Sequence, residues 1–137
     1  MLEWLASTLG REVALAAAYL RLMPAGRSGR LEVAVRVDAR ALPRAFPPMV
    51  LLPLAHAVAA NAAARVTLST VGAKGAPPHG IALRVDASAP PLRWNEDTLA
   101  SLRTTLAQCF GADAALEAGD AGAIVRWTAA GVSPVAA

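Results

Sequence analysis

Few side chains in this sequence have the chemistry for catalysis or metal binding. The chain has 137 residues, with a single cysteine, Cys109, and two histidines, His56 and His79. Neither a Cys/His zinc site nor an internal disulfide can be built from so few groups. The spacing shows no Ser/His/Asp set and no pair of carboxylates, so it gives no support for a hydrolase. We assign no catalytic residue and no metal ligand.

Three polar or nucleophilic residues adjoin apolar segments of the sequence. Asp86 follows an apolar strand pattern, and an aspartate there commonly does no more than end the strand. His56 lies next to the apolar stripe of a helical pattern, where a hydrogen-bonded structural histidine is commoner than a catalytic base. Cys109 adjoins another apolar stripe, and we expect it to be small, buried and inert.

The composition is typical of a folded domain. Hydrophobic residues make up 55% of the chain and charged residues 17%, which excludes a disordered protein. The net charge is +3, but the arginines are spread along the chain and form no basic stripe, so we expect no nucleic-acid partner. The single cysteine and the lack of a signal-peptide pattern at the N-terminus favour a cytoplasmic location.

One stretch is long enough to suggest a membrane span. No charged residue lies between Arg44 and Arg65, and a span needs about 20 apolar residues. The stretch contains Pro47, Pro48 and Pro53, however. We therefore expect a buried helix entered through a proline-rich turn, and no membrane span in this chain.

The N-terminal half predicts a helix, a strand and a second helix. The first helix has an apolar face with spacings of three and four residues, marked by Leu5, Leu9, Val13, Ala16 and Leu20. Arg11 and Glu12 are expected to lie off this face. Alternation of apolar and polar residues predicts a strand over 31–38. The second helix follows Pro48, with Pro53 in its first turn.

The C-terminal half predicts two hairpins with a helix between them. Strands over 66–71 and 81–85 form the first hairpin, and strands over 115–118 and 124–128 form the second. Asn95 is expected to cap the third helix. The order α-β-α-β-β-α-β-β predicts an α+β protein, a two-layer α/β sandwich with a mixed, mostly antiparallel sheet and about three helices on one face.

Three segments of the sequence, taken together, resemble one protein family. Residues 46–54 read FPPMVLLPL, residues 99–111 read LASLRTTLAQCFG, and residues 121–126 read AGAIVR. In this order and spacing they resemble the GHKL (Bergerat-fold) ATPase domain of LytS-type sensor histidine kinases. The resemblance covers residues 8–130 and implies a single domain over 1–137, with 131–137 as a tail.

The sequence departs from this family where the family handles Mg²⁺ and phosphate. In the family's N box a glutamate activates the attacking group and an asparagine helps to hold Mg²⁺, but His56 and Ala57 stand at these positions. Alanine cannot bind a cation that requires oxygen ligands. The later histidine of the same motif is replaced by Asn61.

The two glycine boxes of the family are also altered. Residues 86–90, DASAP, retain only the aspartate, Asp86, which in the family accepts the adenine amino group. Residues 96–99, EDTL, stand at the second box. Glycine-rich loops hold phosphates through backbone N–H groups, whereas Glu96 and Asp97 would repel them.

The resemblance implies a degenerate ATP-binding domain of a bacterial two-component signal-transduction protein, a pseudokinase acting through protein contacts with reduced or lost ATP binding. One alternative is a functional ATP- or ADP-binding catalytic domain with ATP and Mg²⁺ as cofactors. Another is an interaction module that shares only the topology. The candidate nucleotide-binding residues under the resemblance are Asp86, Asn61, His56, Ser88 and Arg103. For Arg103, a place on a helix surface is the ordinary structural explanation.

The family also suggests the partners of such a domain. Its kinases phosphorylate a histidine in a separate dimerisation region that precedes this domain, so we expect no kinase activity from this chain alone. The partner would be another protein, the remainder of a kinase, or a second copy bound through the N-terminal helix that carries Trp4. The chain could also be the cytoplasmic part of a membrane-associated receptor.

Overall fold

The computed structural model describes residues 7–23, 31–61, 65–72, 75–86, 91–110 and 114–127. These ranges contain three α-helices, seven strands and one short 3₁₀ helix. The helices are α1 (Leu9–Arg21), α2 (Leu51–Asn61), α3 (Glu96–Phe110) and the 3₁₀ helix η2 (Ala39–Ala41). The strands are β1 (Ser7–Thr8), β2 (Glu32–Arg36), β3 (Ala45–Phe46), β4 (Arg65–Val71), β5 (Gly80–Val85), β6 (Ala114–Gly119) and β7 (Gly122–Trp127).

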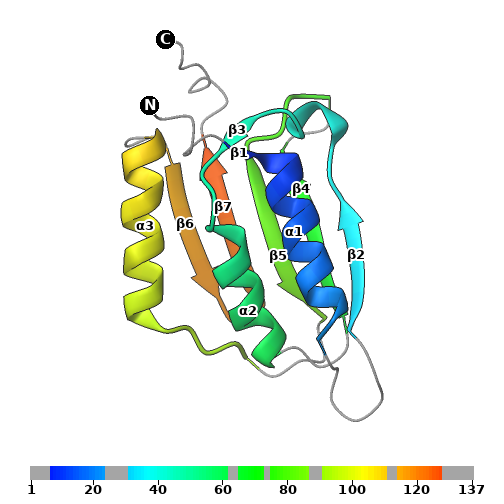
Figure 1. Cartoon of the computed structure of the whole chain (residues 1–137), viewed down its shortest axis with the longest axis vertical. Coiled ribbons are helices and arrows are strands. Elements are labelled where there is room, and N and C mark those ends of the chain that lie inside the picture. Colours follow the sequence, from blue (N-terminus) through cyan, green and yellow to red (C-terminus); the bar gives the residue numbers. More distant parts are fainter. Residues whose placement is uncertain are drawn as a thin grey trace.

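Five of these strands form one mixed sheet in the order β2-β4-β5-β7-β6 (Figure 1). β2 and β4 are parallel, with Val33 opposite Val66, and a parallel pair requires a crossover, which α2 supplies. The other neighbours are antiparallel. The pairs β4–β5 and β6–β7 are the two hairpins predicted from the sequence, and they follow the predicted order of elements.

Each helix begins where the sequence supplies a cap or tolerates a proline. Thr8 Oγ1 accepts a hydrogen bond from the Arg11 backbone N–H at 3.2 Å at the start of α1. Asn95 Oδ1 accepts one from the Thr98 N–H at 3.0 Å, and is therefore the predicted cap of α3. Pro53 is the third residue of α2, in the first turn, where its missing N–H costs no hydrogen bond.

The helices pack on one side of the sheet. α1 and α2 cross one face, and α3 runs beside the edge strand β6 (Figure 1). The predicted apolar faces meet in one core, which includes Leu9, Val13, Ala16, Leu20, Leu51, Leu54, Val58, Leu99, Leu102 and Leu106. Leu5 and the side chain of Phe110 lie outside the described residues. The protein is therefore an α+β, two-layer α/β sandwich, as predicted.

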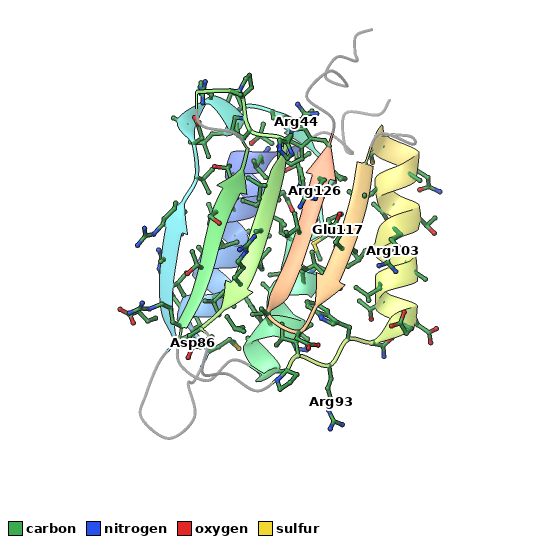
Figure 2. The ribbon with its side chains drawn as sticks, turned by 180° about the vertical axis from the view of Figure 1, so that it is seen from behind. Arg44, Asp86, Arg93, Arg103, Glu117 and Arg126 are labelled. Atoms are coloured by element: carbon green, nitrogen blue, oxygen red, sulfur yellow. The ribbon has the colours of Figure 1, made fainter. Side chains whose placement is uncertain are left out.

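The other face of the sheet is polar and, in the described ranges, carries no helix (Figure 2). Two ion pairs cross between neighbouring strands there. Arg65 Nη2 lies 2.9 Å from Glu32 Oε1, and Arg126 Nε lies 3.1 Å from Glu117 Oε2. Such exposed pairs each contribute about 0–1 kcal/mol to stability. They therefore keep this face polar but stabilise the fold little.

A second, two-stranded sheet anchors the start of α1. β1 pairs with β3 antiparallel, and the first N–H groups of α1 donate to the loop before β3. The Leu9 N–H donates to the Arg44 carbonyl at 2.8 Å, and the Gly10 N–H donates to the Leu42 carbonyl at 2.9 Å. These bonds satisfy donors that a helix end otherwise leaves unpaired.

Two side chains lie where the sequence did not predict them. Glu12 is buried within the core side of α1, whereas it was expected off the apolar face. Its carboxylate is paired by Ser7 and Met49, which makes its burial tolerable. Cys109 is exposed, whereas it was expected to be buried. Partial burial nevertheless raises the pKa of its thiol.

In the uncharged stretch between Arg44 and Arg65, the described residues 45–61 form β3, a turn and α2, and the sequence predicted this helix. Val50, Leu51 and Val58 are fully buried there. No helix in the described ranges is long and apolar enough to cross a membrane.

Candidate functional site

The candidate site is a groove of about 390 Å³ between α2 and the segment that leads into α3. The described residues that line it are Pro53, Leu54, His56, Ala57, Ala60, Arg93, Trp94, Asn95 and Thr98. The helical period places one wall, because Pro53, Ala57 and Ala60 follow each other at spacings of three and four residues along α2. This wall is apolar and made of small side chains.

The opposite wall is fixed by contacts with the β6–β7 turn. The Leu92 N–H donates to the Asp120 carbonyl at 3.0 Å, and Trp94 Nε1 donates to the Gly119 carbonyl at 2.8 Å. Leu92 is buried, so the segment is pinned by packing as well. The result is an aromatic wall whose position depends on the second hairpin.

His56 stands at the rim of the groove and is held from α1. Its Nδ1 lies 2.5 Å from the hydroxyl of Tyr19, and the two ring centroids are 6.0 Å apart. When the neutral ring carries its proton on Nε2, the Tyr19 hydroxyl donates to Nδ1. His56 therefore joins α1 to α2 and has only one ring nitrogen left for any ligand.

Asp86 lies at the end of β5 and is not among the described residues that line the groove. Its Oδ1 accepts a hydrogen bond from the Arg65 N–H at 3.2 Å, and its own N–H donates to the Arg65 carbonyl at 3.3 Å. These bonds extend the β4–β5 ladder by one residue. Figure 2 shows Asp86 at the same end of the sheet as Arg93.

Arg103 has a structural contact on the other side of α3. Its Nε and Nη2 donate to the Leu116 carbonyl at 3.2 and 3.1 Å, so it reaches toward β6 (Figure 2). It does not line the groove. The predicted roles of Ser88, Asn61 and Trp4 stay predictions. Ser88, Trp4 and the side chain of Asn61 lie outside the described residues.

The groove thus gathers some of the predicted positions and adds others. His56, Ala57 and Thr98 come from two separate motifs of the resemblance and share this one site. Arg93, Trp94 and Tyr19 were missed. An arginine and a tryptophan following the Pro90–Pro91 pair were the available signal for the first two, since polar and aromatic residues in connections often carry function.

The charges around the groove are few. Arg93 is the one permanently charged side chain in the described lining of the groove. This lining contains no carboxylate. Glu96 and Asp97 follow in the first turn of α3. Across the described residues, no group of three or more His, Cys, Asp or Glu side chains could hold a metal ion.

A second hollow, of about 510 Å³, lies at the β6–β7 turn on the polar face of the sheet. Its charged lining consists of Arg84, Glu117 and Asp120, of which Glu117 is paired with Arg126. It is more open to solvent and its wall is less apolar than that of the groove beside α2, whereas ligand sites are mostly apolar clefts with a few polar groups. The groove beside α2 is therefore the better candidate.

No family model matches this chain, and none of the curated proteins matches it.

Proposed function

We propose that this chain is a degenerate histidine-kinase-like ATP-binding domain of a bacterial signal-transduction protein, which acts through protein contacts with reduced or lost ATP binding. The observation that carries the proposal is the lining of the groove beside α2. Positions that the resemblance assigns to the N box, His56 and Ala57, lie there together with Thr98 from the second glycine box. This lining supports a proposed nucleotide site whose metal- and phosphate-binding chemistry has been lost.

The side chains of the groove do not fit Mg²⁺ and a triphosphate. Mg²⁺ requires oxygen ligands in octahedral geometry, and the described lining offers an imidazole, an amide and a hydroxyl but no carboxylate. His56 is already bonded to Tyr19. Glu96 and Asp97 in the first turn of α3 add negative charge where the resemblance places the phosphates, and Arg93 is the one cation of the described lining that opposes it.

The alternative is a functional ATP- or ADP-binding domain with an unusual pocket. It is favoured by Asp86, which retains the family's adenine-binding carboxylate at the end of β5, and by Arg93 at the same end of the sheet. Under this alternative, Asp86 would recognise the base and Arg93 would face the phosphates.

Isothermal titration calorimetry with ATP and ADP, with and without Mg²⁺, separates the two functions. A ligand with a Kd below about 100 μM at millimolar concentration would stabilise the native state by more than about 1 kcal/mol, which a thermal-shift assay detects. We expect neither heat nor a shift. Saturable binding that is weakened by Asp86→Asn and unaffected by the control Asp120→Asn, an exposed turn carboxylate, would establish the alternative instead.

A restoring variant tests whether the N-box positions are the cause. His56→Glu with Ala57→Asn returns the family's two side chains to the groove. If the lost metal ligands limit binding, this double variant should show Mg²⁺-dependent nucleotide binding that the parent lacks. The matched control is His56→Gln with Ala57→Ser, which has similar bulk and no carboxylate.

A further inference from the structure

The outward side of α1 carries an apolar seam. Arg11, Leu15, Ala18 and Leu22 follow one another at spacings of four, three and four residues, so they lie in one line along the helix. Leu15 is 45% exposed and Leu22 is 73% exposed, and both are among the few large apolar side chains of the described residues that face solvent. In Figure 1 no described element lies in front of α1.

The spacing of this seam suits one kind of partner. Apolar residues at alternating intervals of three and four form the contact line between two packed helices. Ala18, between the two leucines, allows a second helix to approach closely. The core of the protein does not use this line, because the buried face of α1 lies opposite, through Leu9, Val13 and Leu20.

Charge restricts the partner further. Arg11 and Arg21 are exposed at the two ends of the seam, and no ion pair with either arginine occurs within the described residues. The one acidic residue of α1, Glu12, is buried and bonded, and α2 contains no charged residue at all. Among the described residues, the surface formed by α1 and α2 is therefore apolar, with Arg11 and Arg21 as a positive border that no carboxylate of these two helices neutralises.

We propose that the α1 seam, defined by Leu15, Ala18 and Leu22, binds an amphipathic helix of a partner protein whose apolar stripe is flanked by acidic residues. This rests on the proposed function, since it names the class of partner through which the domain acts. A second copy of this chain fits the seam less well. It would bring arginines against arginines and offers no exposed carboxylate from α1 or α2 to meet them.

The test uses the whole chain and a defined peptide. The probe is a fluorescent helix of about three heptads with Leu at the a and d positions and Glu at the e and g positions. Its fluorescence anisotropy is titrated with the protein. We expect saturable binding that weakens as salt increases, and no binding by the same peptide with Lys in place of Glu.

Surface variants assign the binding to the seam. Leu15→Glu and Leu22→Glu should each weaken binding at least about tenfold, because each buries a charge in the contact. Ala107→Glu adds the same charge to an exposed position of α3, away from the seam, and should change the affinity by less than about twofold. Since these positions are exposed, circular dichroism and the melting temperature should stay unchanged.

Four results would overturn the proposal. The acidic peptide could fail to bind, or it could bind the Leu15→Glu variant as well as the parent. Sedimentation velocity could show a dimer that Leu15→Glu dissociates, which would make a second copy the occupant. Binding to phosphatidylglycerol vesicles through Leu15 and Leu22, without peptide binding, would make it a membrane surface. Nucleotide calorimetry is independent of all four results, so the seam and the proposed loss of ATP binding can fail separately.

Discussion

The buried carboxylate of Glu12 in α1 accepts a hydrogen bond from the backbone N–H of Met49, with Oε1 at 3.1 Å from the nitrogen. Met49 has a left-handed backbone, φ 63°, which is uncommon for a residue with a side chain. The Ser7 hydroxyl donates to the other carboxylate oxygen at 2.8 Å. Glu12 therefore ties the start of the described chain to the turn that enters α2, the helix that forms one wall of the groove.

Removing this carboxylate should destabilise the protein. Glu12→Ala leaves the Met49 N–H and the Ser7 hydroxyl without their acceptor, and we expect a loss of about 1–3 kcal/mol in the free energy of unfolding. Glu12→Gln retains one acceptor oxygen and should lose less. Urea unfolding measures both, with Asp120→Asn, an exposed turn carboxylate outside the ion pairs of the described residues, as the control that should change by less than about 0.5 kcal/mol. Equal stability of Glu12→Ala and the parent would rule out the proposed tie.

Gly122 should be irreplaceable, and Gly119, its partner across the β6–β7 hairpin, should not. A Cβ on Gly122 would lie 1.9 Å from the Leu83 carbonyl oxygen, and its φ of 155° disfavours other residues. A Cβ on Gly119 meets nothing within 4 Å. We expect Gly122→Ala to cost more than about 2 kcal/mol and Gly119→Ala less than about 1 kcal/mol. Similar melting temperatures for the two variants would contradict this.

Arg103 should stabilise β6, the strand at the edge of the sheet. Its substitution should have no effect on nucleotide binding. Its guanidinium covers a carbonyl of β6, the outermost strand, so Arg103→Ala should lose about 1 kcal/mol of stability. Arg103→Lys should recover part of it, because an ammonium lacks the fork that donates twice to Leu116. Amide hydrogen exchange should become faster in β6 in Arg103→Ala, whereas the exposed control Gln108→Ala should leave it unchanged.

The carboxyl of Asp38 should titrate well below the usual range. Hydrogen bonds from the Arg40 side chain and then from its backbone N–H lower the Asp38 pKa from 3.8 to about 2. The folded state therefore favours the carboxylate. The resulting stability is present above about pH 4 and is lost as the pH falls through about 2. An NMR titration of the Asp38 carboxyl carbon measures the value directly.

Arg40 is the partner to remove in that experiment. Arg40→Gln should return the Asp38 pKa toward 3.8, whereas Arg93→Gln, at the other end of the sheet, should leave it near 2. An Asp38 carboxyl that titrates alike in the parent and in Arg40→Gln would show that the two side chains are not paired in solution.

Local patterns in the sequence were enough to predict the main elements. The apolar faces of the helices, the Asn95 cap, Pro53 in a first turn and the two hairpins are all set by residues close in sequence. The β1–β3 pair was missed because strands of two residues carry no alternation to recognise. Glu12 was misplaced because a charged side chain can be buried when distant partners reach it, and those partners are not visible locally.

The same distinction between local and distant information applies to the candidate site. The sequence alone allowed His56, Ala57 and residues 96–99 to be compared with the short motifs of the family that the chain resembles, because such a comparison needs only residues close in sequence. Only the tertiary structure decided that His56 is bonded to Tyr19, that Arg103 turns to β6, and that Trp94 walls the groove. Side-chain direction depends on what packs against the other end of each residue. Those neighbours come from elements far away in the chain, brought together by burial of the shared core.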